Sequence, residues 1–291
     1  MKTTETVKRI AFTVPAIAFV ALFMAYPIIY SFVISLTNFD GTHPIAFRGL
    51  AQYTELFTSR EFWGVSLNNL YFAALGIPLS VIVPLLIAVL LFEEVRGHRV
   101  FKVVYLVPSA LAVAVVGMLF RAFFSYRGPI NRLLSIVKLN ALVIDWFYAG
   151  VTSIPIIILA MVWATYGVNT IIFLAAMSLI PEEVYESAEL DGFSWFQRFY
   201  HLTMPMIISV FEFVTVMSVI TIFSSMFSYI YTITGGGPGY ESTVLEYLIF
   251  IKGFRLNNLA YASATSTVLF FLILILTVVM MRFFARKGDW Q

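Results

Sequence analysis

The chain alternates between long apolar stretches and shorter polar ones, and the apolar stretches set the predicted architecture. A helix of about twenty apolar residues, rising 1.5 Å per residue, crosses the roughly 30 Å of hydrocarbon in a bilayer. The pattern predicts six membrane-spanning helices, at residues 11–36, 67–92, 101–120, 151–179, 206–233 and 260–284. We therefore expect an all-α integral membrane protein with a single transmembrane domain over residues 1–291.

One polar segment, residues 181–204, carries start and stop signals for helices. Pro181 suits the first helical position, and the two glutamates that follow place negative charge where the helix dipole favours it. Asp191 and Gly192 mark the helix end, because glycine readily takes the left-handed conformation found there. Ser194 can then cap a second short helix. The segment predicts a helix, a glycine turn and another helix.

Composition supports the membrane assignment and excludes several classes of function. Hydrophobic residues make up 60% of the chain and charged residues 12%, against about 25% charged in an average soluble domain. There is no cysteine, which excludes disulfides and thiolate chemistry. The three histidines lie in different connecting segments and give no metal-ligand spacing; they are His43, His98 and His201. We therefore expect neither a catalytic site nor a metal site.

Charge gives the expected orientation. Residues 1–9 are basic and precede an apolar run, so the positive-inside tendency places the amino terminus in the cytoplasm. That run is about twice an ordinary signal-peptide core and lacks a clear cleavage site, so we expect a retained span. Arg282, Arg286 and Lys287 favour a cytoplasmic carboxyl end. The net charge of +2 and the lack of a basic run indicate no nucleic-acid partner.

Two of the predicted spans carry polar and aromatic side chains at helical spacing. Neutral hydroxyls of this kind can bind sugar hydroxyls without placing an unpaired charge in lipid. The same residue types also pack helices together in membranes, so a substrate path and a packing surface both remain open. The candidates are Trp163, Tyr166, Gly167 and Thr170 in the fourth span and Ser218, Thr221, Ser225 and Tyr229 in the fifth.

Glu212 is the unusual residue of the fifth span. It lies seven positions after Pro205, about 10 Å into the helix, where an exposed carboxylate is costly. A water-filled vestibule or a basic partner would explain it. A proton relay is a weaker explanation, because no second intramembrane acid or base completes one.

The polar segment resembles the EAA loop of bacterial ABC importer permeases. That loop reads roughly E-A-A, three residues, G, and then about nine residues to I-x-L-P. Glu186, Ser187 and Ala188 take the first places, Asp191 and Gly192 follow at the glycine, and the segment ends at Pro205. The departures are Ser187 and the methionine before the proline. The resemblance implies a cytoplasmic coupling helix that docks into a cleft of an ATPase subunit, with these five residues transmitting ATP-driven closure.

Other segments are similar to sugar permeases of the carbohydrate importer group. Residues 35–41 match S-x-T-N-F-x-G, residues 49–53 approach GL-x-NY, and residues 232–238 contain a similar T-x-GGP element. The resemblance covers nearly the whole chain. It implies a permease subunit of a carbohydrate-type ABC importer, similar to the maltose and glycerol-phosphate permeases, and the first of a heterodimeric pair in the bacterial cytoplasmic (inner) membrane.

That resemblance also implies the partners. They would be a second permease subunit, two cytoplasmic ATPase subunits that hold ATP and Mg, an extracytoplasmic solute-binding protein and membrane lipid. This chain would bind no cofactor, and it lacks a GxxxxGK[ST] loop of its own. One alternative is an importer permease for glycerol phosphodiesters or another non-sugar solute. A second is a secondary transporter, which usually shows internal repeats or broken helices with intramembrane charges; only Glu212 fits that description.

Overall fold

A computed structural model describes residues 13–92 and 106–288, with side chains up to residue 284. The basic amino-terminal residues, His98 and the beginning of the predicted third span lie outside the described residues, as do the side chains of Arg286 and Lys287. Within the described ranges the fold is helical and contains no strand. An isolated bridge pairs Thr37 with Phe47.

Four of the described helices are long and apolar enough to cross a membrane. A helix pairs its backbone polar groups within itself, which apolar surroundings require. Two further apolar segments are a helix pair bent by 72° and a shorter helix, so six apolar segments are present and the all-α membrane fold is confirmed. The segments are Thr13–Ser35 (its end is α2, Tyr26–Ser35), α4 (Arg60–Phe92), α6 (Val113–Phe123), α8 (Gly150–Met177), the bent pair Trp195–Met206 with Ile208–Ser224, and α15 (Leu259–Gly288).

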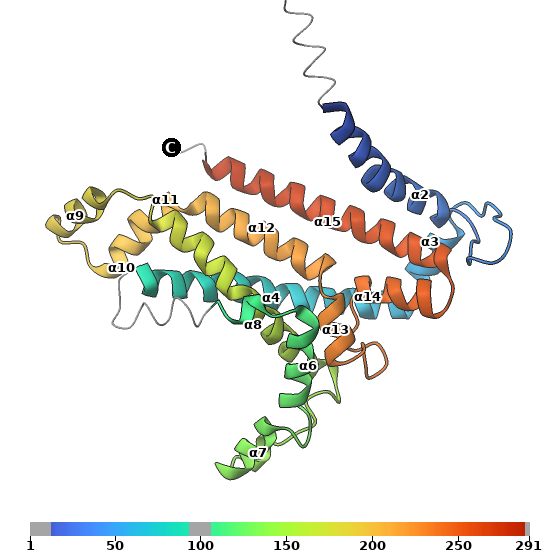
Figure 1. Cartoon of the computed structure of the whole chain (residues 1–291), viewed down its shortest axis with the longest axis horizontal. Helices are drawn as coiled ribbons and strands as arrows, with labels where there is room; N and C mark the ends of the chain where they lie inside the picture. The colour runs from blue at the N-terminus through green and yellow to red at the C-terminus, as the bar shows by residue number, and fades with distance from the viewer. Residues whose placement is uncertain (1–12, 93–105, 289–291) are drawn as a thin grey trace, which may run out of the picture. The chain divides into compact units, whose positions relative to one another are not determined.

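Shorter elements connect these helices (Figure 1). They are α3 (Ala51–Thr58), η2 (Pro108–Ala110), α7 (Pro129–Ile136), η3 (Asn140–Leu142), α9 (Glu182–Leu190), α13 (Phe227–Ile233), α14 (Leu245–Phe250) and η5 (Ile251–Arg255). The bent pair itself consists of α10 (Trp195–Arg198), η4 (Phe199–Thr203), α11 (Met204–Met206) and α12 (Ile208–Ser224). Helix Thr13–Ser35 also contains a π turn, η1 (Ala21–Ala25).

Two predicted spans differ from the structure. The fifth, expected as one helix over residues 206–233, is divided: α12 ends at Ser224, Ser225 has φ −138° and ψ 18°, and α13 begins at Phe227. In the third, the backbone is extended at Ala112, the N-cap of α6. Apolar periodicity does not report such breaks, because the side chains on either side of them are equally apolar.

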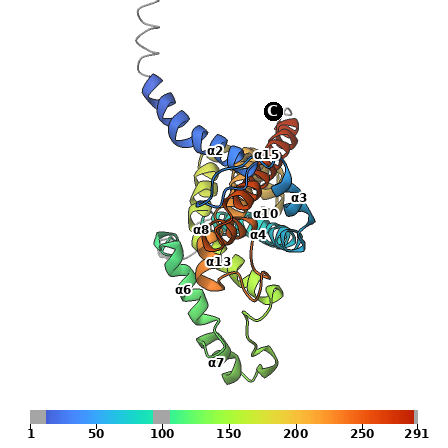
Figure 2. The same cartoon turned by 90° about the vertical axis from the view of Figure 1, so that its right-hand side faces the viewer.

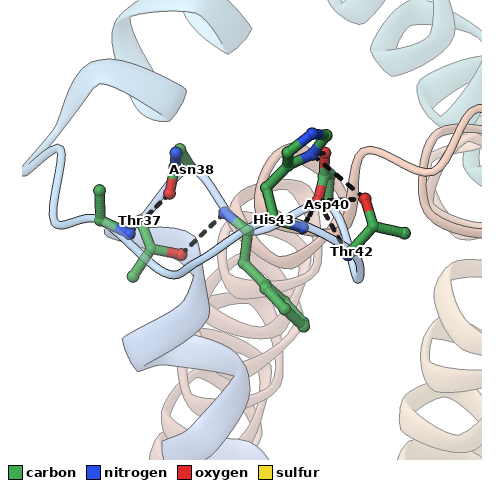
Figure 3. A network of polar contacts seen from close by, with 7 residues as sticks. Thr37, Asn38, Asp40, Thr42 and His43 are labelled. Atoms are coloured by element: carbon green, nitrogen blue, oxygen red, sulfur yellow. Dashed lines mark hydrogen bonds and ion pairs between the residues drawn. The ribbon is translucent and has the colours of Figure 1, made fainter.

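The backbone contacts divide the chain into two compact units: residues 1–62 with 248–271, and residues 63–247 with 272–291. In the first unit, Lys252 Nζ lies 2.9 Å from Glu61 Oε2. A polar turn also belongs to this unit, in which the Asp40 carboxylate accepts hydrogen bonds from the Thr42 and His43 N–H groups (Figure 3). The single transmembrane domain expected from the sequence stays a prediction.

The second unit is built around α8, which contacts α4 and α12 (Figure 1 and Figure 2). Pro84 has no N–H, so the carbonyl of Ser80, one turn earlier in α4, loses its helical donor. Asn169 of α8 supplies a replacement, with its Nδ2 at 3.1 Å from Ser80 O. The apolar core around this contact consists of Val81, Leu85, Ala88, Val89, Phe173, Met177, Ile207 and Val214.

The same unit contains a close crossing of α6 and α13. A β-carbon placed on Gly117 would lie 1.8 Å from Thr232 Oγ1, far inside any real contact distance. The absence of a side chain at Gly117 therefore permits α6 to approach α13 this closely, as small residues do in membrane helix pairs.

Candidate functional site

The candidate coupling segment forms the helix, turn and helix that its sequence predicts. Helix α9 ends at Leu190 with Asp191 as its C-cap, and Gly192 has φ +77°. The N–H groups of Gly192 and Phe193 donate to the carbonyls of Glu189 and Ala188, at 3.0 and 2.9 Å. These two bonds close the helix end in the manner that favours glycine. Pro181 is the N-cap of α9 and not its first helical residue, so that prediction was wrong by one position.

Ser194 caps the second helix as expected, and the structure adds a reciprocal bond. Ser194 Oγ accepts from the Gln197 N–H at 3.4 Å, and Gln197 Oε1 accepts from the Ser194 N–H at 2.8 Å. Sequence reasoning missed Gln197, although the S-x-x-Q spacing of a capping box was readable. Helix α10 then continues through the π turn η4 into α11.

One face of the segment packs inward. The Tyr185 ring lies 5.6 Å from the Phe92 ring, and its hydroxyl lies 3.2 Å from Thr203 Oγ1. Ala188 is 4% exposed. The other four predicted coupling residues are exposed; they are Glu186, Ser187, Asp191 and Gly192. The structure thus places one coupling residue in the packed face and leaves four on an open surface.

The open surface also presents large apolar side chains that sequence reasoning did not single out. Leu190 is 89% exposed, Phe196 67% and Tyr200 63%. The aromatic run around Trp195 was the readable signal. The rings of Phe196 and Tyr200 stack with their centroids 6.4 Å apart. Because exposed apolar groups that lie together mark surfaces that bind partners, this surface fits a protein contact.

The fourth-span candidates do not form one open surface. Thr170 is fully buried, donates to Tyr166 O at 2.7 Å and lies 3.3 Å from Pro84 O of α4. The Trp163 ring lies 5.7 Å from the Phe120 ring of α6, and Gly167 is buried. In this structure Thr170 and Trp163 make packing contacts between helices. Tyr166 is partly exposed.

The break in the fifth span divides its hydroxyl stripe. Ser218 and Tyr229 are buried, and the Ser218 hydroxyl donates to Val214 O at 2.8 Å. Thr221 is partly exposed and donates to Met217 O at 2.9 Å. Ser225 is exposed at the break itself. Within the stripe, the accessible hydroxyls are therefore those of Thr221 and Ser225, next to the end of α12.

Glu212 is partly buried on α12, and among the described residues it forms no hydrogen bond and no ion pair. The described part of the chain contains no group of three or more His, Asp or Glu side chains that could hold a metal ion. The arrangement offers hydroxyls, aromatic rings and a docking surface.

Comparison with known proteins assigns the chain to a family. Residues 50–288 match the family described as binding-protein-dependent transport system inner membrane component. The trehalose/maltose transport system permease protein MalF of Thermococcus litoralis is 30% identical over 272 residues, covering 92% of this chain and 90% of that protein. The sn-glycerol-3-phosphate transport system permease protein UgpA of Yersinia pestis is 31% identical over 281 residues, covering 95% and 94%.

A solved structure has the same fold. It is a bacterial ABC transporter involved in the import of the acidic polysaccharide alginate; the similarity has a TM-score of 0.82 at 22% identity and covers 98% of this chain and 99% of the other. The coupling-type segment, the apolar helices and the family match agree. The chain belongs to the binding-protein-dependent transport system inner membrane components, the multi-pass permeases of ABC importers.

Proposed function

We propose that the chain is one of two permease subunits of an ATP-driven importer that carries a sugar across the cytoplasmic membrane. An extracytoplasmic binding protein would deliver the sugar, and two ATPase subunits would hold ATP and Mg. The observation that carries this proposal is the α9–α10 segment, whose glycine turn and cap fix a helical hairpin with an exposed face. Both termini would lie in the cytoplasm, on the same side as this hairpin.

A neutral sugar is favoured by the chemistry of the described spans. Their Lys and Arg residues stand at or near the ends: Arg60, Arg121, Arg198, Arg282, Arg286 and Lys287. The polar groups farther in are mostly hydroxyls and amides, which hydrogen-bond sugar hydroxyls without a buried charge. The similarity to MalF supports a sugar. The similarity to UgpA, an sn-glycerol-3-phosphate permease, supports a phosphate-bearing solute, such as a glycerol phosphodiester, as the second candidate.

In the proposed cycle the chain performs no bond chemistry. Closure of the ATPase pair would push on Glu186, Ser187, Asp191 and Gly192, and Ala188 would pass the displacement to the packed face beneath. The π turn and α11 connect this segment to α12 through Ile207, so a displacement there would reach the fifth span directly.

The test is purification of the tagged chain in mild detergent, with identification of proteins recovered in stoichiometric amount. We expect a second permease and an ATPase containing a GxxxxGK[ST] loop.

A Phe196→Asp variant should lose the ATPase and keep the permease, because it places a charge in the exposed apolar surface. In proteoliposomes, uptake should require ATP. A chain that purifies alone and transports solute without ATP would establish a secondary transporter instead.

The substrate is tested separately, by competition. Proteoliposomes that contain the complete transporter and its binding protein are given one labelled solute at a time: maltose, lactose or a glycerol phosphodiester. The other solutes are added unlabelled as competitors. Uptake inhibited by neutral sugars and not by the phosphodiester supports the proposal, and the reverse result supports the second candidate.

A further inference from the structure

Glu246 of α14 contacts the break in the fifth helix. Its Oε2 accepts hydrogen bonds from the backbone N–H groups of Met226 and Phe227, at 2.7 and 3.0 Å. The carboxylate is partly buried, and burial raises its pKa although the two N–H bonds lower it. Among the described residues no cation forms an ion pair with Glu246.

The break creates the two donors that Glu246 accepts. The first N–H groups of a helix have no carbonyl one turn earlier, and Met226 and Phe227 begin α13. An N-cap side chain accepts from the second or third helical N–H, so it would not pair these two donors, and the acceptor here lies twenty residues later in the chain. A carboxylate in this position also interacts favourably with the helix dipole. Glu246 therefore attaches α13 to α14.

Helix α14 is in turn anchored to α4. Asn69 Oδ1 accepts from the Leu245 N–H at 2.8 Å, and Asn69 is 1% exposed. The neighbouring Asn68 donates to the carbonyls of Tyr240 and Thr243, at 2.8 and 2.9 Å. The glycine-rich loop between α13 and α14 is thus held on the same helix as α14 itself.

Hydrogen bonds within the glycine-rich loop and a ring contact join α13, the loop and α14 to one another. The hydroxyls of Thr234 and Ser242 lie 2.8 Å apart, and Thr243 Oγ1 donates to Gly236 O at 3.0 Å. The rings of Phe227 and Tyr247 lie 5.6 Å apart, which joins α13 to α14 a second time. We call α13, the loop of residues 234–244 and α14 the outer body. Along the chain it follows α12 at the exposed Ser225.

We propose that Glu246 is a positioning residue for transport: it holds the outer half of the fifth helix on α4, so that α12 turns about Ser225 without carrying α13 with it. Helix α12 continues from the coupling segment, whereas α13 belongs to the outer body. Glu246 then converts the break into a hinge between a moving inner half and a fixed outer half. This inference rests on the proposed importer function.

The hinge is measured directly with spin labels, because the chain contains no native cysteine. One pair spans the break, Phe213→Cys with Ser228→Cys, and a control pair lies on the unbroken α4, Leu70→Cys with Leu86→Cys. At 1.5 Å per helical residue, the 16 residues of the α4 pair give roughly 24 Å, and the pair across the break has a separation of the same order, within reach of pulsed EPR. The purified complete transporter in nanodiscs is compared with and without Glu246→Ala.

We expect both wild-type distance distributions to be narrow. Glu246→Ala should broaden the pair across the break and leave the α4 pair unchanged, and Glu246→Gln, whose amide oxygen still accepts an N–H, should give an intermediate width. An unchanged distribution across the break in the alanine variant overturns the proposal. Broadening of both pairs also overturns it, because it would mean a general loss of structure.

Uptake gives a second reading. The two hydrogen bonds to the Glu246 carboxylate stabilise the attachment of α13 to α14, and Glu246→Ala removes both. We therefore expect maximal uptake to fall roughly tenfold in this variant, while the KM for the loaded binding protein changes little. Glu246→Gln should recover part of the rate, and the exposed Glu55→Gln should match wild type. Equal uptake by Glu246→Ala and wild type overturns the positioning role. If wild type itself shows no ATP-dependent uptake, the proposed function fails, and the distance measurement still decides the role of Glu246.

Discussion

Single side chains compensate for backbone features that would otherwise weaken the membrane helices. Asn169 supplies the donor that Pro84 removes from the Ser80 carbonyl. Where no water reaches, an unpaired carbonyl is expensive, so one amide makes a proline acceptable within a long helix. The adjacent Thr170 hydroxyl already donates within its own helix, to Tyr166.

This difference yields a prediction for two neighbouring residues. Asn169→Leu should destabilise the protein by about 1–3 kcal/mol, because it leaves the Ser80 carbonyl without a donor. Thr170→Val should have a smaller effect, since its hydroxyl bonds mainly within α8. Thermal unfolding of both variants in the same detergent measures this. An equal or reversed order would contradict the role assigned to Asn169.

Gly192 acts through its backbone conformation and not through its surroundings. A β-carbon there would meet nothing within 4 Å, but φ is +77°. Gly192→Val should therefore strain the turn by about 1–2 kcal/mol, and we expect ATP hydrolysis to continue with little uptake. Gly192→Asn is the matched control, because asparagine tolerates this conformation and should keep most of the uptake. Normal uptake by the valine variant would remove Gly192 from the coupling mechanism.

At the scale of elements, a short turn can be held in its shape by a single hydrogen-bond acceptor. In the turn of Figure 3, Asp40 accepts from the N–H groups of Thr42 and His43 and from the Thr42 hydroxyl, and its second oxygen lies 2.5 Å from His43 Nδ1. The two backbone N–H bonds, with smaller contributions from the side chains, hold the pKa of Asp40 well below its usual range. The turn is therefore organised by an ionised carboxylate.

The sign of that pKa shift fixes the pH response. A carboxyl with a lowered folded-state pKa adds stability above its ordinary value, and this contribution is lost as pH falls toward the folded pKa. We expect the Thr42 and His43 amides to exchange hydrogen slowly near neutral pH and to lose protection on acidification. In Asp40→Asn, measured at the same pH values, protection should be lower at neutral pH and should change little with acid. Equal protection in both proteins would contradict the assignment.

The elements that could be predicted from the sequence are those with local signals. The end of α9 can be recognised from Gly192 alone, and the cap of α10 from Ser194 and Gln197. The division between α12 and α13 could not be predicted, because its acceptor, Glu246, lies twenty residues away and is recognisable only in three dimensions. Hydroxyl spacing likewise could not show that Thr170 faces α4, since packing and substrate contact need the same residue types.

At the scale of the whole molecule, the spans differ greatly in how much of each the chain itself buries. In the most apolar window of α8, 56% of the residues are buried, against 6% in helix Thr13–Ser35. Helix α8 is thus internal to the fold. Most side chains of the first span are exposed.

This difference in burial predicts that an isoleucine-to-alanine substitution has different effects in α8 and in the first span. Ile157→Ala, at a fully buried position of α8, should destabilise the isolated chain by about 2–5 kcal/mol. Ile29→Ala, at a position that is 62% exposed, should change its stability by less than about 0.5 kcal/mol. Thermal unfolding of the detergent-solubilised chain measures both. A large effect at Ile29 would mean that the first span packs within the chain more tightly than its exposure indicates.

The crossing of α6 and α13 restricts how this sequence can diverge. Because a β-carbon at position 117 would lie 1.8 Å from Thr232 Oγ1 and 2.8 Å from Thr232 Cβ, position 117 cannot gain a side chain unless position 232 also changes. Among descendants of this gene, alanine at 117 should therefore be found together with glycine at 232. A side chain at position 117 therefore depends on the residue at position 232, although 115 residues separate the two positions along the chain.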